Sequence, residues 1–287
     1  VPYLAYEIVK YNKLASTKMG IKLKGIMVGN ACTDPRECWE PGADANVSIY
    51  QYEYLYNHGF YTENEYDLMR GACMMGYHSQ GCNEIRDRLD KKFGATNTSL
   101  LNIYLPCYYS KVSSGKPFKQ LQSGKKLDLA DFVDCDDHAG IDEWLNVATI
   151  QAELHVDPVH YEMCSDKVAD NYFVGENQSY WIYPELIKEK LRIWVYSGDL
   201  DADVPITGTL TWLKRLREDY HLPIEEPWRE WWVPGKHKHE DQVGGMIWGL
   251  RGLTFASVKG AGHMVPKDQK QSSFVLVNSF LEGTLLP

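Results

Sequence analysis

Residues 253–266 have the sequence LTFASVKGAGHMVP, in which an apolar run is followed by a glycine-rich turn. The run Leu253–Val258 is typical of a short buried strand, and the glycines after it are typical of a tight turn. A turn at the end of a strand holds its residues exposed yet supported, which is what a general base such as His263 requires. The alternative is a loop histidine that only caps the turn.

Residues 191–205, with the sequence LRIWVYSGDLDADVP, have the same organisation. An apolar strand again leads into a turn, and this turn carries Asp199, Asp201 and Asp203. An aspartate and a later histidine, each at a strand end, have the chain order of the last two members of a Ser, Asp, His hydrolase triad. We therefore expect an α/β fold. Its parallel strands are predicted at residues 21–29, 191–197 and 253–258.

Several short blocks of the sequence, taken together, resemble the serine carboxypeptidase family. They occur in the family's order and at about its spacing. The blocks are GDLDADVP at 198–205, Gly208-Thr209, Trp212, QVGG at 242–245 and GAGHMVP at 260–266. The resemblance extends upstream to about Ile21, and we expect it to cover the whole chain. It implies an α/β-hydrolase fold with a mainly helical lid subdomain inserted into it.

The resemblance also implies roles for the acids and the histidine. The triad acid of the family is the second Asp of its GD-x-D motif, which is Asp201 here, and the triad base is His263 of GAGHMVP. Asp199 and Asp203 receive no catalytic role. Met264, beside the base, is expected to line the leaving-group side of a substrate-binding site, and the alternative is that it only packs.

The nucleophile of such a triad is not found in its family context. In the family, a VP-x-LA sequence like that at residues 1–5 follows the Glu-Ser-Tyr-Ala-Gly motif of the nucleophile, and neither this motif nor the glycine-rich oxyanion loop is present. Ser197 lacks the Gly-x-Ser-x-Gly context of a nucleophile elbow. We therefore expect the serine and the first strands of the sheet to lie upstream, and the present residues alone to be inactive.

The expected organisation has three parts: hydrolase core at residues 1–36, inserted lid subdomain at 37–140, and hydrolase core again at 141–287. Cysteines match two family disulfides, Cys73–Cys82 and Cys107–Cys135, which implies structural bridges rather than catalytic thiols. Cys32–Cys38 is a weaker expectation from proximity alone. The family partner of Cys164 lies upstream of Val1, so Cys164 is expected to have no partner within residues 1–287.

Local patterns predict further elements. Thr62–Glu65 has the pattern of a capping box that opens a helix. A helix is predicted over Asn83–Phe93, and an edge-type strand at residues 226–233. After the aspartate turn, a helix is predicted with Leu210, Leu213 and Leu216 inward and with Lys214, Arg215 and Arg217 outward. The last helix is predicted to pack into the core through Phe274, Leu276, Val277, Phe280 and Leu281.

Composition excludes several classes of function. The chain has 287 residues, 44% of them hydrophobic, which suits one large domain or a core with an inserted subdomain. Its net charge of −9, without a basic cluster, argues against nucleic-acid binding. No apolar run approaches the length of a membrane span. His237 and His239 have the spacing of a metal-binding pair on a strand, but Gly235 and the adjacent lysines favour a surface loop, so neither metal nor cofactor is expected.

Three sequons, at Asn46, Asn97 and Asn177, occur together with seven cysteines. This combination suits a glycosylated protein in an oxidising compartment. We therefore expect a protein of the secretory pathway that is secreted, lysosomal or vacuolar.

The favoured function is a serine-type carboxypeptidase that releases C-terminal residues from peptides. An alternative is a relative that uses the same triad for acyl transfer or as a hydroxynitrile lyase. An alternative of another class is a non-catalytic binding or protective protein. The partners expected are a peptide substrate and the upstream half of the same protein, and a homodimer is left open.

Overall fold

The computed structural model describes two units of this chain. One comprises Val1–Lys91, Leu100–Ile103 and Glu176–Pro287, and the second comprises Lys92–Ser99 and Tyr104–Gly175. The described residues are 1–14, 20–34, 50–74, 79–106, 139–162, 165–169, 171 and 178–287. The boundaries expected between hydrolase core and lid subdomain, after residues 36 and 140, stay predictions. Some residues for which the sequence analysis made predictions lie outside the described ranges: Cys38, Asn46, Cys107, Cys135, Cys164 and Asn177.

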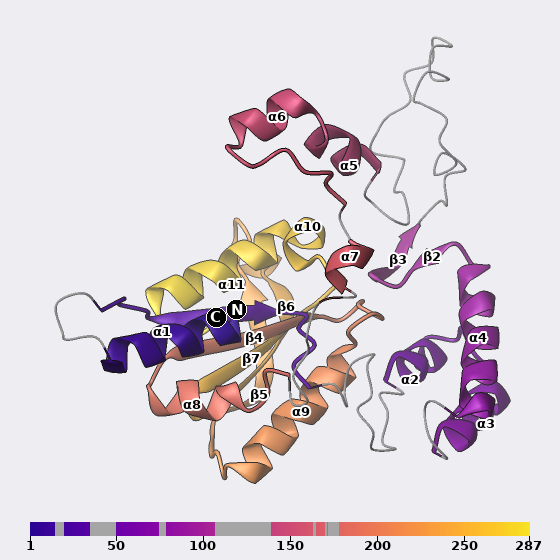
Figure 1. Ribbon diagram of the computed structural model, residues 1–287. Helices are drawn as coiled ribbons and strands as arrows, with labels where there is room; N and C mark the ends of the chain where they lie inside the picture. Colours follow the sequence, from indigo (N-terminus) through magenta and orange to yellow (C-terminus); the bar gives the residue numbers. More distant parts are fainter. Residues whose placement is uncertain are drawn as a thin grey trace. The chain divides into compact units, whose positions relative to one another are not determined.

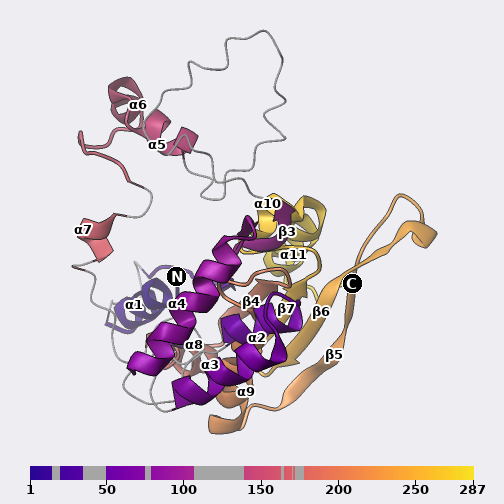
Figure 2. The ribbon, with the colours of Figure 1, turned by 90° about the vertical axis from the view of Figure 1, so that its right-hand side faces the viewer.

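The first unit is built on a five-stranded sheet of order β1-β4-β7-β6-β5 (Figure 1). β4 pairs in parallel with β1 on one side and with β7 on the other, which confirms the predicted parallel pairing. β6 and β5 extend the sheet as a long antiparallel pair, with β5 at the edge as predicted (Figure 2). The strands are β1 Gly25–Gly29, β4 Arg192–Gly198, β5 Ile224–Val233, β6 Gln242–Leu250 and β7 Leu253–Val258.

β1 begins at Gly25, although the sequence predicted a strand from residue 21. The side chain of Asn12 explains the late start. Its Nδ2 donates to the carbonyl oxygen of Ile21 at 2.8 Å, and its Oδ1 accepts from the Ile21 amide at 2.8 Å. The backbone of Ile21 is therefore bonded to a helix side chain rather than to a neighbouring strand.

Helices cover both faces of the sheet (Figure 1). On one face, α1 (Pro2–Leu14), α8 (Ile182–Lys188) and α9 (Ile206–Asp219) share a core with β1, β4 and β7. On the other, α11 (Lys270–Glu282) packs against the sheet through Leu276. Burial of each large apolar side chain contributes about 1.5–3 kcal/mol relative to exposure, so the two cores hold the central strands firmly.

The outward position predicted for Arg215 is wrong. Its guanidinium forms an ion pair with Asp34, whose side chain is only 3% exposed, and lies 4.3 Å from the centre of the Tyr180 ring. A buried carboxylate is costly without a cationic partner, and Arg215 on α9 supplies one. The charge of Asp34 thus explains why Arg215 points toward the protein, although it lies on the face of α9 that was predicted to be exposed to solvent.

The predicted packing of α11 is wrong in part. Leu276 is buried, whereas Phe274, Val277 and Leu281 are 68%, 41% and 68% exposed. These three residues lie on one stripe of the helix, opposite the stripe of Leu276. The buried stripe is completed by small side chains, which let the helix approach the sheet closely: Ser272, Ser273 and Ser279.

Three further helices belong wholly or mainly to the first unit: α2 (Tyr50–Asn57), α3 (Glu63–Met74) and α4 (Gln80–Gly94). The capping box before α3 is confirmed, because Thr62 N–H donates to Glu65 Oε2 at 2.8 Å and Glu65 N–H donates to Thr62 Oγ1 at 3.3 Å. α4 begins earlier than the predicted residue 83. Ser79 caps it by accepting a hydrogen bond from the Cys82 amide at 3.3 Å.

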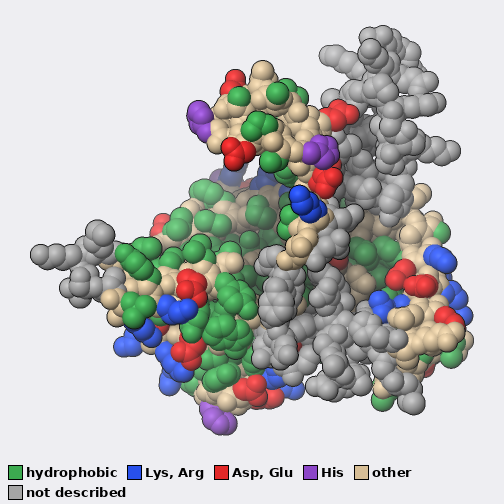
Figure 3. Space-filling view, in the orientation of Figure 1, with side chains coloured by type: hydrophobic (Ala, Val, Ile, Leu, Met, Phe, Trp, Pro, Cys, Tyr) green, Lys and Arg blue, Asp and Glu red, His purple; other side chains and the backbone are tan. Residues whose placement is uncertain are grey.

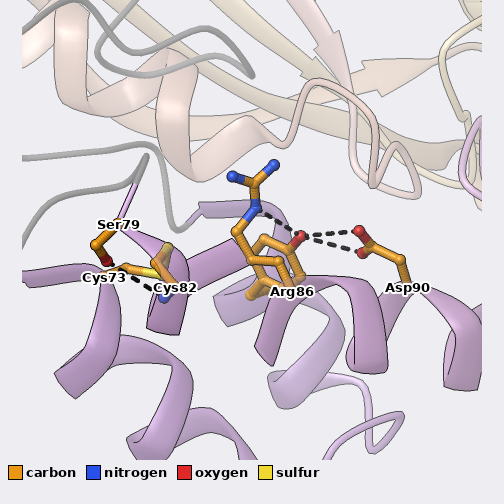
Figure 4. Close-up of a disulfide and its surroundings, with 6 residues drawn as sticks. Cys73, Ser79, Cys82, Arg86 and Asp90 are labelled. Atoms are coloured by element: carbon orange, nitrogen blue, oxygen red, sulfur yellow. Dashed lines mark hydrogen bonds between the residues drawn. A yellow bond between two sulfur atoms is a disulfide. The ribbon is translucent and has the colours of Figure 1, made fainter. Parts of the chain in front are cut away.

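The predicted disulfide Cys73–Cys82 is confirmed, and it joins α3 to α4 (Figure 4). Nearby, the hydroxyl of Tyr52 donates to Asp90 Oδ1 at 3.0 Å and accepts from Arg86 Nε at 3.3 Å. These contacts tie α2 to α4. Cys32 is also disulfide-bonded.

The second unit contains short elements. They are β2 (Thr98–Ser99), most of β3 (Asn102–Pro106), α5 (Ala139–Leu145), α6 (Ala148–Glu153) and α7 (Asp166–Ala169). Gln151 Nε2 donates to the carbonyl oxygens of Leu145 and Val159, which fastens α6 to the end of α5 and to the loop after α6. His155 follows the C-cap of α6 with a positive φ of 56°, the left-handed conformation that is common just after a helix end.

The chain ends and the linking turns complete the first unit. α10 (Val265–Asp268) follows the histidine turn, and a 3₁₀ turn at Lys238–Glu240 lies between β5 and β6.

Hydrophobic side chains are visible on the surface over α1 in the space-filling view (Figure 3). Leu4 and Leu14 on that helix are 68% and 86% exposed. None of the helices among the described residues is both long and apolar enough to cross a membrane.

Candidate active site

Asp201 and His263 lie together at one edge of the sheet. Asp201 is in the turn after β4, and His263 is in the turn after β7, the parallel neighbour of β4. His263 Nδ1 lies 2.8 Å from Asp201 Oδ2, so the contact predicted from the sequence is confirmed. Because parallel strands carry their carboxyl ends to the same edge, residues 62 positions apart in the sequence meet there.

Asp201 is wholly buried, and its carboxylate is held by several donors besides the histidine. Oδ2 accepts from Asn30 Nδ2 at 2.7 Å. Oδ1 accepts from the backbone amides of Asp203 at 2.9 Å and Val204 at 3.0 Å. A buried charge is tolerated where hydrogen bonds replace water, and here they also fix the orientation of the carboxylate.

His263 has the environment of a histidine prepared to take a proton. The hydrogen bond to Asp201 raises the pKa of His263, burial opposes this, and the charges of Asp201 and Asp203 add to the rise. With Nδ1 directed at a carboxylate, the tautomer favoured by this bond carries its proton on Nδ1. Nε2 is then the ring nitrogen available to a reacting group. The His263 side chain is 30% exposed, so the ring is not sealed from solvent.

Of the two neighbouring acids, Asp199 supports the turns through its side chain. Asp199 Oδ1 accepts from the Gly260 amide at 2.7 Å, which links the aspartate turn to the histidine turn. Gly260 has a φ of +74°, a conformation that favours glycine. Burial raises the pKa of Asp199. Burial also raises the pKa of Asp203, the charge of Asp201 adds to the rise, and His263 opposes it.

Met264 and Ser197 are the other site candidates named from the sequence. Met264 follows the histidine directly and is 52% exposed. A role for it in substrate binding remains an expectation. Ser197 has no exposed surface, and its hydroxyl bonds to Thr209 Oγ1 at 3.3 Å. A serine in this position cannot reach a substrate, which agrees with its lack of a nucleophile motif.

Asn30 is the site residue that the sequence analysis missed. It follows β1 directly, its amide donates to the carbonyl oxygen of Tyr196 at 2.9 Å, and its φ is +41°. Asparagine adopts this left-handed conformation more readily than most residues. An asparagine at the carboxyl end of a parallel strand, next to the predicted aspartate strand, was the available signal.

No metal site is formed by the part of the chain that the structure describes, since it brings no three His, Cys, Asp or Glu side chains together. The rings of His237 and His239 stack with their centres 5.6 Å apart. Both are exposed, and they lie at the 3₁₀ turn between β5 and β6, as the surface-loop interpretation predicted.

With this geometry established, the sequence can be compared with known proteins. A profile of the serine carboxypeptidase family matches residues 1–283. The chain belongs to the serine carboxypeptidase family. Among its relatives, serine carboxypeptidase-like 29 and serine carboxypeptidase 24, both of Arabidopsis thaliana, are each 30% identical to it over the whole chain. The chain spans 56% and 59% of their lengths.

A solved structure of the prohormone-processing carboxypeptidase Kex1Δp from Saccharomyces cerevisiae matches 98% of this chain and 59% of its own, with a TM-score of 0.70 and 18% identity. This likeness confirms the α/β-hydrolase fold expected from the sequence. Within this fold, Asp201 and His263 lie at the sheet edge formed by the carboxyl ends of β4 and β7.

Proposed function

We propose that this chain supplies the acid and the base of a serine-type carboxypeptidase, whose nucleophilic serine is contributed by an upstream segment of the same protein. The observation that carries the proposal is the 2.8 Å contact of Asp201 with His263, in a chain matched by the family profile over residues 1–283. The substrate is a peptide, and the reaction releases its C-terminal residue.

In the proposed reaction, His263 Nε2 takes the proton from the serine hydroxyl as the serine oxygen attacks the scissile carbonyl carbon. The same nitrogen then gives that proton to the departing amino group, and water hydrolyses the acyl-enzyme in a second round. Asp201 holds Nδ1–H and stabilises the imidazolium, without itself taking the proton. Its hydrogen bonds from Asn30 and from the Val204 amide keep it in place through both steps.

The upstream segment is also the partner that we propose for the exposed edge of β1. β1 pairs only with β4 among the strands of its sheet, which leaves its other edge unpaired within the described residues. Strand edges of this kind accept another strand. Addition of the upstream segment here would carry its serine to the sheet edge that already holds His263. For the same reason we propose that residues 1–287 alone do not hydrolyse peptides.

The proposal includes passage through the secretory pathway. Cys73–Cys82 is bonded and Cys32 is also in a disulfide, which suits an oxidising compartment. The Asn97 sequon lies on an exposed turn, where an oligosaccharide would be accommodated. Mass spectrometry of the protein from a eukaryotic secretory host tests this, and an unmodified, intracellular product would contradict it.

The decisive experiment is hydrolysis of a blocked dipeptide by the full-length protein, measured over a pH series. His263→Ala should abolish turnover, and Asp201→Asn should lower it by about 10⁴-fold. Asp199→Asn is the matched control, since an amide oxygen can still accept from Gly260, and it should retain most activity.

A fluorophosphonate label should mark the upstream serine and no serine of residues 1–287. Transfer of the acyl group to an added alcohol, without hydrolysis, would identify an acyltransferase instead. Absence of both labelling and turnover in the full-length protein would favour a non-catalytic binding protein. Robust hydrolysis by residues 1–287 alone would overturn the assignment of the nucleophile.

A further inference from the structure

A short backbone segment, Leu100–Ile103, lies against both turns of the candidate site. We call it the bracing segment. Leu100 O accepts from the Ala202 amide at 2.9 Å, and the Ile103 amide donates to Leu200 O at 3.2 Å. The two residues that flank Asp201 are therefore both bonded to the bracing segment.

The bracing segment also holds the histidine directly. The backbone amide of His263 donates to Leu101 O at 2.7 Å. Gly262, one residue earlier, lies so close that a Cβ atom there would be 2.0 Å from Leu101 O. Only glycine permits this approach, so the histidine turn and the bracing segment are fitted backbone to backbone.

One side chain completes the connection. Asn102 is buried, and its Nδ2 donates to Asp268 Oδ2 at 2.8 Å. The same oxygen accepts from the Gly262 amide at 2.7 Å. Asp268, at the end of α10, thus also ties the histidine turn to the bracing segment through its side chain.

The bracing segment belongs to the first unit, although Lys92–Ser99 before it and Tyr104–Gly175 after it belong to the second. Its four residues thus group with the unit that contains the aspartate and histidine turns, to which they are bonded, and not with the segments before and after them in the sequence. An ordinary surface loop has no need of such bonds, since its backbone can be satisfied by water.

We propose that the bracing segment positions the Asp201–His263 pair, and that Asn102 is a positioning residue for the reaction. It would set the separation and orientation of two turns that come from different strands. It makes this contribution without touching the substrate. The proposal rests on the proposed function in so far as His263 is the base. A misplacement of about 1 Å in a catalytic group can cost on the order of 100-fold in rate.

The test is Asn102→Ala in the full-length protein, with turnover of a blocked dipeptide and the NMR titration of the His263 ring as readouts. We expect kcat to fall by roughly 10- to 100-fold while KM changes little. The pKa of His263 should fall toward that of an ordinary histidine, because the bond to Asp201 is what raises it. The matched control is Asn12→Ala, which also removes a hydrogen-bonded side-chain amide, in this case one bonded to the backbone of Ile21 and far along the chain from both turns.

A second variant, Asn102→Asp, keeps the size of the side chain and places a carboxyl against Asp268. Its loss of turnover should exceed that of Asn102→Ala and should shrink, relative to wild type, at a pH where the new carboxyl is protonated. Wild-type kcat and a wild-type His263 pKa in both variants would overturn the proposal. If the wild-type protein shows no hydrolysis at all, the proposed function fails, and the His263 titration still decides whether the bracing segment positions the pair.

Discussion

Asn30 Nδ2 donates to Asp201 Oδ2 at 2.7 Å, across 171 residues of sequence. The same oxygen accepts from His263 Nδ1 at 2.8 Å, so the asparagine and the histidine share one carboxylate oxygen. The side-chain oxygen of Asn30 in turn accepts from the Gly198 amide at 3.4 Å. Asn30 thereby connects the end of β1 to the aspartate turn after β4, and it limits the rotation of the Asp201 carboxylate.

Removal of the Asn30 side chain should destabilise the fold. Asn30→Gly keeps the positive φ without strain and leaves the buried carboxylate one donor short, so the free energy of unfolding should fall by about 1–3 kcal/mol. Asn30→Ala should lose more, because alanine is also strained at a φ of +41°. Urea denaturation of the two variants and the wild type separates the hydrogen bond from the backbone effect. A glycine variant as stable as wild type would show that the hydrogen bond from Asn30 to Asp201 makes no net contribution to the free energy of unfolding.

The Asp201–His263 pair should make stability depend on pH in a definite direction. The pKa of His263 is raised in the fold, so the pair's contribution is complete below the pKa of the unfolded histidine and is lost as the pH rises through the raised folded value. The difference in unfolding midpoint between wild type and His263→Ala should therefore shrink from mildly acidic to alkaline pH. Asn57→Ala, which changes an exposed side chain without a titratable group, is the control and should show no such trend. A difference that grows with pH would contradict the assigned sign.

Ionisation of Asp203, which is partly buried, should also make the stability of the fold decrease as the pH rises. Its pKa is raised in the fold, mainly by burial, so its ionisation costs stability as the pH rises from the ordinary carboxyl range through the raised value. Asp203→Asn should therefore raise the unfolding midpoint at neutral pH and leave it unchanged in strong acid. It should also lower the pKa of His263, to which the Asp203 charge contributes. Glu282→Gln, at an exposed helix end, is the control for loss of one negative charge.

The sequence was sufficient for the features that depend on local pattern. Apolar runs ending in a glycine or aspartate turn predicted β4 and β7, and the family motifs in those turns predicted the contact of Asp201 with His263. The capping box at Thr62 was likewise visible, because both of its partners lie within four residues. Each of these predictions uses groups whose relation is fixed by neighbours in the chain.

Features that depend on distant partners were not predictable in this way. The place of Asn30 at the end of a predicted strand was visible in the sequence, but nothing near it identifies Asp201, 171 residues away, as its partner. Nothing in residues 100–103 indicates that they bond to two turns of the sheet. The prediction for the orientation of Arg215 was wrong for the same reason. Helical periodicity predicts that a long cationic side chain faces solvent unless a buried acid elsewhere in the fold is known.

The ion pair of Arg215 with Asp34 gives a last prediction. Asp34 is almost fully buried, so Arg215→Met, which removes its cationic partner on α9, should lower the free energy of unfolding by about 3–5 kcal/mol. The double variant Asp34→Leu/Arg215→Met removes both charges together. It should be more stable than Arg215→Met alone, since replacement of a buried pair by apolar groups is often nearly neutral. Chemical denaturation of both variants, with the adjacent exposed cation changed in Lys214→Met as control, measures this. A double variant less stable than Arg215→Met would mean that Asp34 stabilises the fold through groups other than Arg215.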